Sequence, residues 1–207
     1  MREMIKMIII LTILSTFSGT LLAALYNKTK DKIEYQQLKF VKGPAVREII
    51  KGSSNDPIID RFKIKDGDTE KSFFIGVFDG EADSVVFETF GTGYQGKVGL
   101  MVGVNIKDDK IVGVGVTTHT ETPGVGSLAK TDPTFVSQFK GLPIDQEFKV
   151  KADGGKIDAM SGATFTSRGV SAAATEASKM YQRLKLQIIE SLKNFKSSGT
   201  QVGEQDG

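Results

Sequence analysis

Apolar residues follow three different patterns along the chain. Residues 7–26 form one run without a charged side chain. Between about 57 and 116, short segments rich in Val, Ile and Phe are separated by turn residues such as Asp66-Gly67, a pattern typical of antiparallel strands joined by hairpins. From about 166 to 194, apolar residues recur at steps of three and four, which predicts one long amphipathic helix.

The first run predicts a single transmembrane helix. A helix over 7–26 would span roughly 30 Å, the thickness of a bilayer core. The alternative is a cleaved signal peptide, for which Ala23 and Ala24 supply small residues near a cleavage site. We favour the anchor because the run is longer than a signal-peptide core of about 7–15 residues. Basic residues flank both ends of the run, so the charges leave its orientation open.

The remaining chain predicts an α+β domain, in which an antiparallel sheet is packed with helices. After the strands we expect a loop over 119–127, a short helix with Asp132 as its N-cap, and one further strand over 146–152. The long helix carries an apolar stripe that we expect to pack on the sheet: Val170, Ala174, Ala177, Tyr181, Leu184 and Ile188. The predicted divisions are an anchor at 1–27, a juxtamembrane helical linker at 28–52, a folded domain at 53–196 and a disordered tail at 197–207.

Composition then excludes several kinds of chemistry. Lys and Arg number 27 against 25 Asp and Glu, a formal net charge of +2, which argues against a nucleic-acid-binding protein. There is no cysteine and only one histidine, so we expect no thiolate or multi-histidine metal site and no thiol nucleophile. If this protein carries out redox chemistry, it therefore needs an organic cofactor.

Residues 91–96 match the dinucleotide-binding pattern G-x-G-x-x-G, but their context does not fit. In that fingerprint the third glycine opens a helix whose start binds the pyrophosphate. Here the following residues, 97–106, are strand-like. We therefore interpret these glycines as a loop between two strands. A weaker functional interpretation is that Tyr94 and these glycines line a pocket for a flat ligand.

The segment 158–167 is the strongest candidate for chemistry. Small residues and several hydroxyls precede the long helix, whose first N–H groups lack partners within the helix and carry the positive end of its dipole. Such a start is suited to a phosphate group. An ordinary capped helix start remains the alternative, because Ser and Thr are preferred N-caps.

A resemblance to a known family sharpens this interpretation. The segment Asp158-Ala159-Met160-Ser161-Gly162-Ala163-Thr164 resembles the flavinylation motif D-x-x-[ST]-G-A-T of FMN-binding domains. Those domains occur in the G subunit of the Rnf electron transport complex and in the C subunit of the sodium-pumping NADH:quinone reductase. The stretch 121–126 is similar to the family's E-T-P-G-[LV]-G loop, which lies close to the flavin.

In that family the last threonine of the motif is joined by a phosphoester to FMN, in a reaction that a separate flavin transferase carries out with FAD. The resemblance therefore implies covalent FMN on Thr164. The predicted cofactor-binding residues are Thr164, Asp158, Ser161, Gly162, Ala163, Thr166, Ser167, His119, Glu121, Thr122, Gly124, Gly126 and Tyr94. No catalytic residue and no metal ligand are predicted.

Several individual roles stay open at this point. Asp158 would orient the threonine hydroxyl or be recognised by the transferase, or else act as a turn or cap residue. His119 would contact and tune the flavin, or form an ordinary hydrogen bond in its loop. Glu121 is expected at the flavin ring or ribityl chain. Arg168 would neutralise the phosphate or be a solvated cation, and Phe165 is expected in the core rather than on the flavin.

The resemblance is strongest to the Rnf type, because the chain is short. It implies a membrane-anchored flavoprotein that relays electrons in an ion-translocating ferredoxin:NAD oxidoreductase and is not a stand-alone enzyme. Its implied partners are other membrane subunits, the flavin transferase and the bilayer of the cell membrane, with the FMN domain on the extracytoplasmic side. The alternatives are a subunit of a sodium-translocating NADH:quinone reductase, and a membrane-tethered binding or assembly module without covalent flavin.

Overall fold

The computed structural model describes residues 2–195, which form two units divided between Phe40 and Val41. The first unit is helix α1 (Arg2–Gln37), whose first 29 residues, Arg2–Lys30, are long and apolar enough to cross a membrane. This helix is therefore a candidate single membrane span. A π-helical turn, η1 (Leu38–Lys42), separates it from α2 (Gly43–Ile49). The predicted tail at 197–207 lies outside the described residues.

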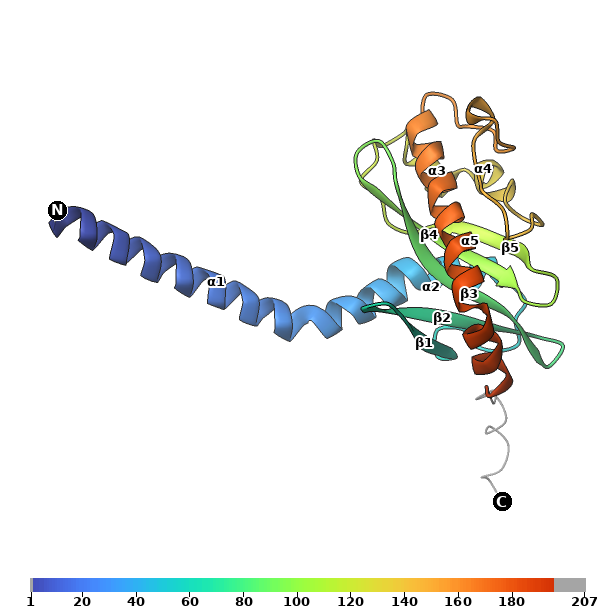
Figure 1. Ribbon diagram of the computed structural model, residues 1–207, viewed down its shortest axis with the longest axis horizontal. Coiled ribbons are helices and arrows are strands. Elements are labelled where there is room, and N and C mark those ends of the chain that lie inside the picture. The colour runs from blue at the N-terminus through green and yellow to red at the C-terminus, as the bar shows by residue number, and fades with distance from the viewer. Residues whose placement is uncertain (1, 196–207) are drawn as a thin grey trace, which may run out of the picture. The chain divides into compact units, whose positions relative to one another are not determined.

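The second unit is built on a five-stranded antiparallel sheet (Figure 1). Its strands follow the chain in the order β1 (Arg61–Asp66), β2 (Thr69–Phe78), β3 (Glu81–Thr92), β4 (Lys97–Asn105) and β5 (Lys110–Val116). Each strand pairs with the next through a short turn. The meander predicted from the hairpin pattern is thus confirmed.

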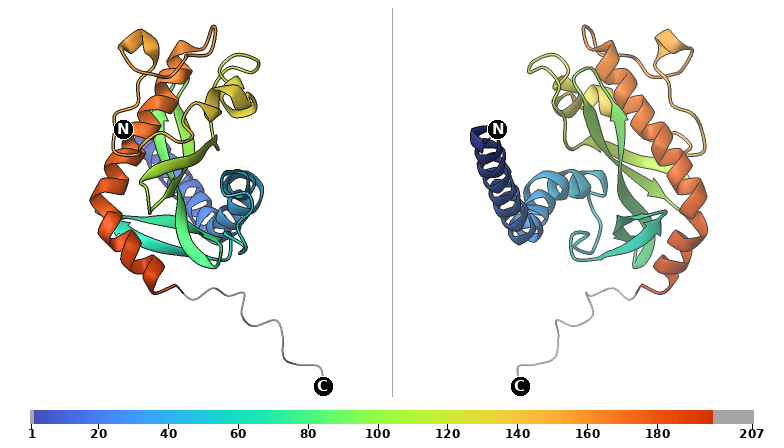
Figure 2. Two further views of the ribbon diagram at one scale, coloured as in Figure 1. Left: turned by 90° about the vertical axis from the view of Figure 1, so that its right-hand side faces the viewer. Right: turned by 60° about the vertical axis from the view of Figure 1, so that its left-hand side comes forward.

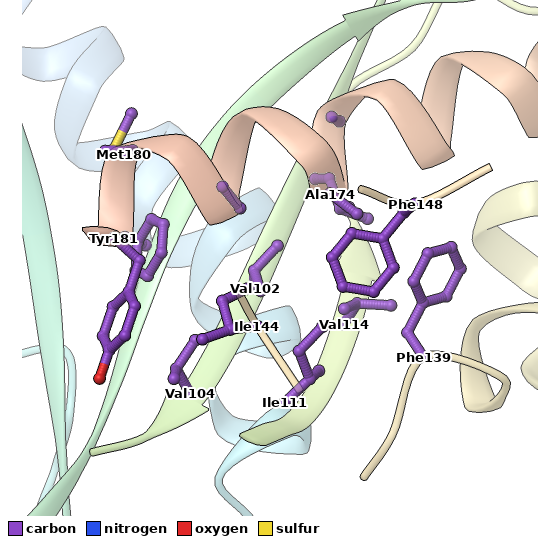
Figure 3. Packing of buried hydrophobic residues seen from close by; sticks show 14 of the residues in the cluster. Val102, Val104, Ile111, Val114, Phe139, Ile144, Phe148, Ala174, Met180 and Tyr181 are labelled. Carbon is purple, nitrogen blue, oxygen red and sulfur yellow. The ribbon is translucent and has the colours of Figure 1, made fainter. Parts of the chain in front are cut away.

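Helix α5 (Thr164–Lys193) packs on one face of the sheet (Figures 1 and 2). Every residue of the predicted apolar stripe is buried, which confirms that the stripe packs on the sheet. Figure 3 shows Ala174 and Tyr181 of this helix on the side of Val102 and Val104 of β4. Burial of such side chains stabilises the fold by about 1.5–3 kcal/mol each.

Helix α2 covers the opposite face, and glycines make room for it (Figure 2). A Cβ at Gly113 would lie 3.6 Å from Cγ2 of Ile49, and one at Gly115 would lie 3.5 Å from Cβ of Ala45. At Gly103 a Cβ would collide with the Ile49 side chain. The alternation of β4 thus places valines toward α5 and a glycine toward α2, which brings a short helix close to the strand backbone.

Short helices connect β5 to α5. They are α3 (Leu128–Thr131), α4 (Pro133–Ser137) and the 3-10 turn η2 (Lys151–Asp153). Asp132 caps α4 as predicted, because its Oδ1 accepts a 2.8 Å hydrogen bond from the Thr134 N–H. The strand predicted over 146–152 is wrong. Phe148 and Val150 are buried, but the only ladder contact described there is a bridge from Val150 to Ile157.

Candidate functional site

The segment with the pattern G-x-G-x-x-G lies at the β3–β4 hairpin, where Gly91 and Thr92 end β3 and residues 93–96 form the turn. The N–H of Gly93 donates to the carbonyl of Gly96 at 2.8 Å, and β4 begins at the next residue. No helix follows the third glycine. The interpretation of this segment as a loop between two strands is therefore confirmed, and the dinucleotide-binding alternative is excluded.

The start of α5 leaves its first backbone donors open. Thr164 is the first helical residue, and no side chain caps the helix at Ala163. The adjacent Ser167 does not serve as a cap, because its hydroxyl accepts from the Met160 N–H and donates to the Ala163 carbonyl, both at 3.0 Å. Gly162 precedes the start at a φ of +74°, a backbone conformation that favours glycine. An uncapped helix start of this kind can bind an anion.

A cavity of about 160 Å³ opens at this helix start. Three segments far apart in the sequence form its wall: the β3–β4 hairpin tip, the loop that contains Glu121, and the first turn of α5. Its lining residues are Tyr94, Glu121, Thr122, Val125, Gly126, Gly162, Ala163, Thr164, Phe165 and Thr166. The fold thus brings the two sequence motifs together with the hairpin tip.

Glu121 joins these three segments from beneath the cavity. It is only 4% exposed. Its Oε1 accepts from the Gln95 N–H at 3.0 Å, and its Oε2 accepts from the Tyr94 N–H at 3.2 Å and from the Thr166 hydroxyl. The carboxylate therefore fixes the hairpin tip to the helix start, and the shape of the cavity depends on it.

The same contacts keep Glu121 ionised. Burial raises the pKa of the carboxyl, but the hydrogen bonds from Thr166, Gln95 and Tyr94 and the nearby His119 outweigh it, so the net pKa is lowered. Donation to the charged form is the physical cause. The cavity is consequently bordered by a buried negative charge at neutral pH.

Two glycines make room for this carboxylate. A Cβ at Gly93 would lie 2.6 Å from Oε1 of Glu121. A Cβ at Gly126 would lie 2.7 Å from the Thr166 hydroxyl oxygen and 2.8 Å from Cβ of Glu121. Real Cβ atoms do not approach other atoms so closely, so the packing around Glu121 requires glycine at both positions.

Aromatic rings form the outer rim of the cavity. Tyr94 and Phe165 are exposed, with ring centroids 6.1 Å apart, and the Arg168 guanidinium lies 5.4 Å from the Phe165 ring centre. Arg168 also bonds Asp153 through two nitrogens, each at 2.7 Å. The prediction that Phe165 lies in the core is wrong, because it is 60% exposed, and the buried positions of α5 begin only at the next residue, Thr166.

The structure places some predicted site residues away from the cavity wall. Asp158 forms an exposed ion pair with Lys151, at 2.7 Å. Ser161 is exposed on the turn before α5, and Ser167 faces inward. Gly124 adopts a φ of +72° in a turn, where its N–H donates to the Ser127 hydroxyl.

His119 also lies outside the lining, although it acts electrostatically on Glu121. Its Nδ1 is buried, and no residue in the described part of the chain gives it a hydrogen-bond partner. Two contributors to the site were not among the predicted site residues, although Val125 lies in the predicted loop 121–126. Val125 lines the cavity, and Gln95 bonds Glu121 through its backbone and Thr122 through its side chain at 3.0 Å. The alternation of strand and turn residues carries no signal for the contacts of Gln95.

The residues present fit a ligand with an anionic end and a flat ring. The open N–H groups of α5 suit a phosphate, and the Thr164 hydroxyl lies beside them without a side-chain hydrogen bond to any described residue. The exposed rings of Tyr94 and Phe165 offer apolar surface for the ring of the ligand. The donor set thus matches a flavin mononucleotide held by its phosphate.

Comparisons with known proteins agree with this geometry. A family model described as an FMN-binding domain matches residues 93–179, the range that contains the hairpin tip, the Glu121 loop and the start of α5. The G subunit of an ion-translocating oxidoreductase complex from Methanosarcina acetivorans is 32% identical over 171 residues, which cover 82% of this chain and 89% of that protein.

Two further comparisons extend the likeness. A protein of the same name from Pseudomonas aeruginosa is 29% identical over 193 residues, which cover 87% of this chain and 89% of that protein. The crystal structure of the C subunit of a Na⁺-translocating NADH-quinone reductase from Parabacteroides distasonis aligns with a TM-score of 0.54 at 23% identity, covering 78% of this chain and 96% of that chain. This second likeness is one of fold.

Proposed function

Since this chain belongs to the family of G subunits of ion-translocating oxidoreductase complexes, and is as such an FMN-binding electron-transfer subunit, we propose that its FMN is attached covalently to Thr164. The link is a phosphoester between the Thr164 hydroxyl and the FMN phosphate. The observation that carries the proposal is the position of this hydroxyl, in the cavity wall at an uncapped helix start.

The surrounding residues supply what such a link requires. The open N–H groups of α5 and its dipole stabilise the phosphodiester charge by about 0.3–1 kcal/mol when exposed, and by up to about 2 kcal/mol when partly buried. Glu121 holds the helix start and the hairpin tip at a fixed separation. Tyr94 and Phe165 border the space for the flavin ring. The bound flavin supplies the electron-transfer chemistry.

A separate flavin transferase forms the bond. A threonine hydroxyl needs a base to become a nucleophile, and the carboxylate nearest in the described cavity wall, Glu121, is already engaged by Thr166. With FAD as donor, the Thr164 hydroxyl oxygen bonds to the FMN phosphorus, the pyrophosphate bond breaks, AMP leaves and the hydroxyl proton is released. The exposed turn before α5, which includes Ser161 and Asp158, is accessible to such an enzyme.

We assign the chain to an Rnf-type complex that couples ferredoxin:NAD oxidoreduction to ion translocation. The support is the 32% identity to a G subunit over 89% of that protein's length. The chain is then an electron relay held by one membrane helix, with other membrane subunits as partners. We place the FMN domain on the extracytoplasmic side, by resemblance to the family. A reporter fused after Gly207 tests this orientation. If a reporter that works only in the cytoplasm is active there, the extracytoplasmic placement is contradicted.

The covalent link is tested by co-expression with a flavin transferase, followed by a denaturing gel. We expect a fluorescent band for the wild type and for Thr164→Ser, which keeps a hydroxyl. The band should be dark for Thr164→Val, which keeps the shape but lacks the hydroxyl. Thr69→Val makes the same change at an exposed position of β2, outside the motif and the cavity lining, so it is the matched control and should stay fluorescent. A dark wild-type band would favour the alternative of a tethered binding or assembly module without covalent flavin.

A further inference from the structure

Strand β3 has an edge that no described strand covers. β2 pairs with β3 only as far as Phe73 opposite Phe87, and the remaining residues of β2 pair with β1. β3 continues to Thr92, with β4 on its other side (Figure 2, right). Within the part of the chain that the structure describes, residues 88–91 therefore form a sheet edge that no strand covers, and at Thr92 the carbonyl lies against Gly169 of α5.

The backbone groups of Phe90 point toward this open edge. Phe90 lies opposite Gly99 of β4. Gly99 uses both of its backbone groups on the far side, because its N–H donates to the Thr118 carbonyl at 2.7 Å and its carbonyl accepts from the Thr117 N–H at 2.9 Å. The Phe90–Gly99 pair is therefore a non-hydrogen-bonded pair of the ladder. It follows that the N–H and carbonyl of Phe90 face away from β4, where no described residue bonds them.

This edge forms one wall of a groove of about 510 Å³. The other wall is the segment 147–150, and the outward side of α5 forms the floor. Ser171 lies in this floor, is only 2% exposed, and its hydroxyl has no hydrogen-bond partner among the described residues. Phe90 is exposed beside it. Buried hydroxyls are normally hydrogen-bonded, so Ser171 is an independent sign of an absent polar partner.

The charges of the groove are already paired with one another. Three ion pairs lie among its lining residues: Lys149–Glu147 at 2.8 Å, Arg168–Asp153 at 2.7 Å and Lys179–Glu176 at 4.0 Å. Each pair joins one basic and one acidic side chain, so together they leave no net charge in the groove. The groove therefore favours an uncharged occupant that brings hydrogen-bonding backbone groups.

We propose that an extended, uncharged segment of another protein of the complex adds to β3 as a further strand, with its backbone hydrogen bonds made to Phe90. A peptide strand satisfies an open row of N–H and carbonyl groups, and its alternate side chains fill the groove beside it. The next residues after this edge form the hairpin tip with Tyr94, so the added strand lies next to the cavity. The proposal rests on membership of a complex of several proteins and does not depend on covalent flavin.

Two variants of Phe90 isolate the backbone contact. Both Phe90→Pro and Phe90→Ala remove the ring, but only proline also removes the N–H that faces the edge. Proline at an edge position is tolerated when its nitrogen faces away from the ladder. In the full complex purified through a tag on this chain, we expect Phe90→Ala to retain the other subunits. Phe90→Pro should recover about tenfold less of them, which corresponds to about 1.4 kcal/mol. Equal recovery with the two variants would overturn the proposal.

A photo-crosslinking residue at Thr92, in the otherwise wild-type membrane complex, keeps the proposal testable if proline disturbs folding. We expect a crosslink to an uncharged segment of another protein of the complex, identified by mass spectrometry. A crosslink to a second copy of this chain, or none, would overturn the proposal. Flavin fluorescence on the gel reports Thr164 independently, so loss of the other subunits with a bright band separates this proposal from that of the covalent flavin.

Discussion

The buried and partly buried carboxylates near the two ends of helix α5 have different hydrogen-bond partners. Toward the C-terminal end, carboxylates meet basic side chains: Arg183 bonds Asp66 through two nitrogens at 2.9 and 2.7 Å, and Lys185 Nζ lies 2.6 Å from Asp109 Oδ2. At the first turn, the buried carboxylate of Glu121 accepts hydrogen bonds from neutral donors instead. No side chain caps that end of the helix.

This difference indicates how one helix serves both stability and function. The C-terminal half carries buried apolar residues and two ion pairs to the sheet unit, so it fixes the helix on the sheet. The first turn keeps open N–H groups, an unbonded hydroxyl and exposed rings, which do not pack on the sheet and are typical of a ligand site. Substitutions at the two ends should therefore separate effects on folding from effects on flavin attachment.

The largest effect on folding is expected at the packed end. Leu184→Ala removes a fully packed side chain, 3% exposed, and should lower the free energy of unfolding by about 2–5 kcal/mol. Leu186→Ala on the same turn is the matched control, because Leu186 is 82% exposed and should change stability by less than about 0.5 kcal/mol. Urea unfolding measures both. Equal losses in the two variants would show that this half of α5 does not pack as described.

The next effect is expected at Glu121. Glu121→Ala leaves two backbone N–H groups and the Thr166 hydroxyl without their acceptor, which should cost about 1–3 kcal/mol and loosen the cavity. Glu121→Gln keeps the shape and part of the hydrogen bonding, so it should retain more stability and a brighter flavin band. Unfolding curves and gel fluorescence test the pair. An alanine variant as stable and as bright as the wild type would contradict the role of Glu121 in holding the hairpin tip to the helix start.

The lowered pKa of Glu121 gives this site a pH dependence. A carboxyl whose folded-state pKa lies below its unfolded value contributes stability above the unfolded value, near 4.5, and loses it as the pH falls through the folded-state pKa. We expect the stability difference between wild type and Glu121→Gln to shrink as the pH falls below about 4.5. A difference that stays constant down to about pH 3 would contradict an ionised Glu121.

A smaller effect is expected from Tyr181, which is buried and donates to Asp109 Oδ1 at 2.7 Å. Burial is the main cause that raises its pKa, and the bond to Asp109 adds to it. Tyr181→Phe should cost about 1.5 kcal/mol, the lower end for a bond to a charged group. Because the folded-state pKa is raised, wild type should lose this advantage as the pH rises above about 10. Stability measured at about pH 7 and about pH 11 checks the sign.

The smallest effect is expected from the Arg183–Asp66 pair. Arg183 is about half exposed, so solvent screens the pair, and Arg183→Gln should cost no more than about 1 kcal/mol. The loss should fall further at high salt, because surface charges are screened. Neither Arg183→Gln nor Tyr181→Phe should change flavin fluorescence. A dark band in either variant would mean that the two ends of α5 are not independent.

Much of the fold could be predicted because local patterns and tertiary packing agree. Turn residues such as Asp66-Gly67 mark the hairpins, and the steps of three and four in α5 mark its buried face. The same reasoning wrongly predicted a strand over 146–152. Phe148 and Val150 alternate as in a strand and are buried, but the N–H of Phe148 donates to the Thr175 hydroxyl on α5 instead of to a neighbouring strand.

The site was harder to predict, because side chains that are neighbours in a sequence motif point in different directions once the segment forms a helix. Thr164 and Thr166 reach the cavity wall, whereas Ser167 turns inward to Met160. Arg168, predicted either to pair with the phosphate or to be a solvated cation, is exposed and bonds Asp153, a residue that no motif marks. The bonds from Gln95 to Glu121 and Thr122 join segments more than twenty residues apart, beyond the reach of any local pattern.

The most direct test of attachment at the open helix start is peptide mass spectrometry on the chain matured with a flavin transferase. We predict one FMN adduct, located on Thr164 and absent from Thr164→Val. The mass should correspond to FMN joined through its phosphate with loss of water. An unmodified Thr164, or an adduct on Ser161 or Thr166 instead, would contradict the assignment of the start of α5 as the place of attachment.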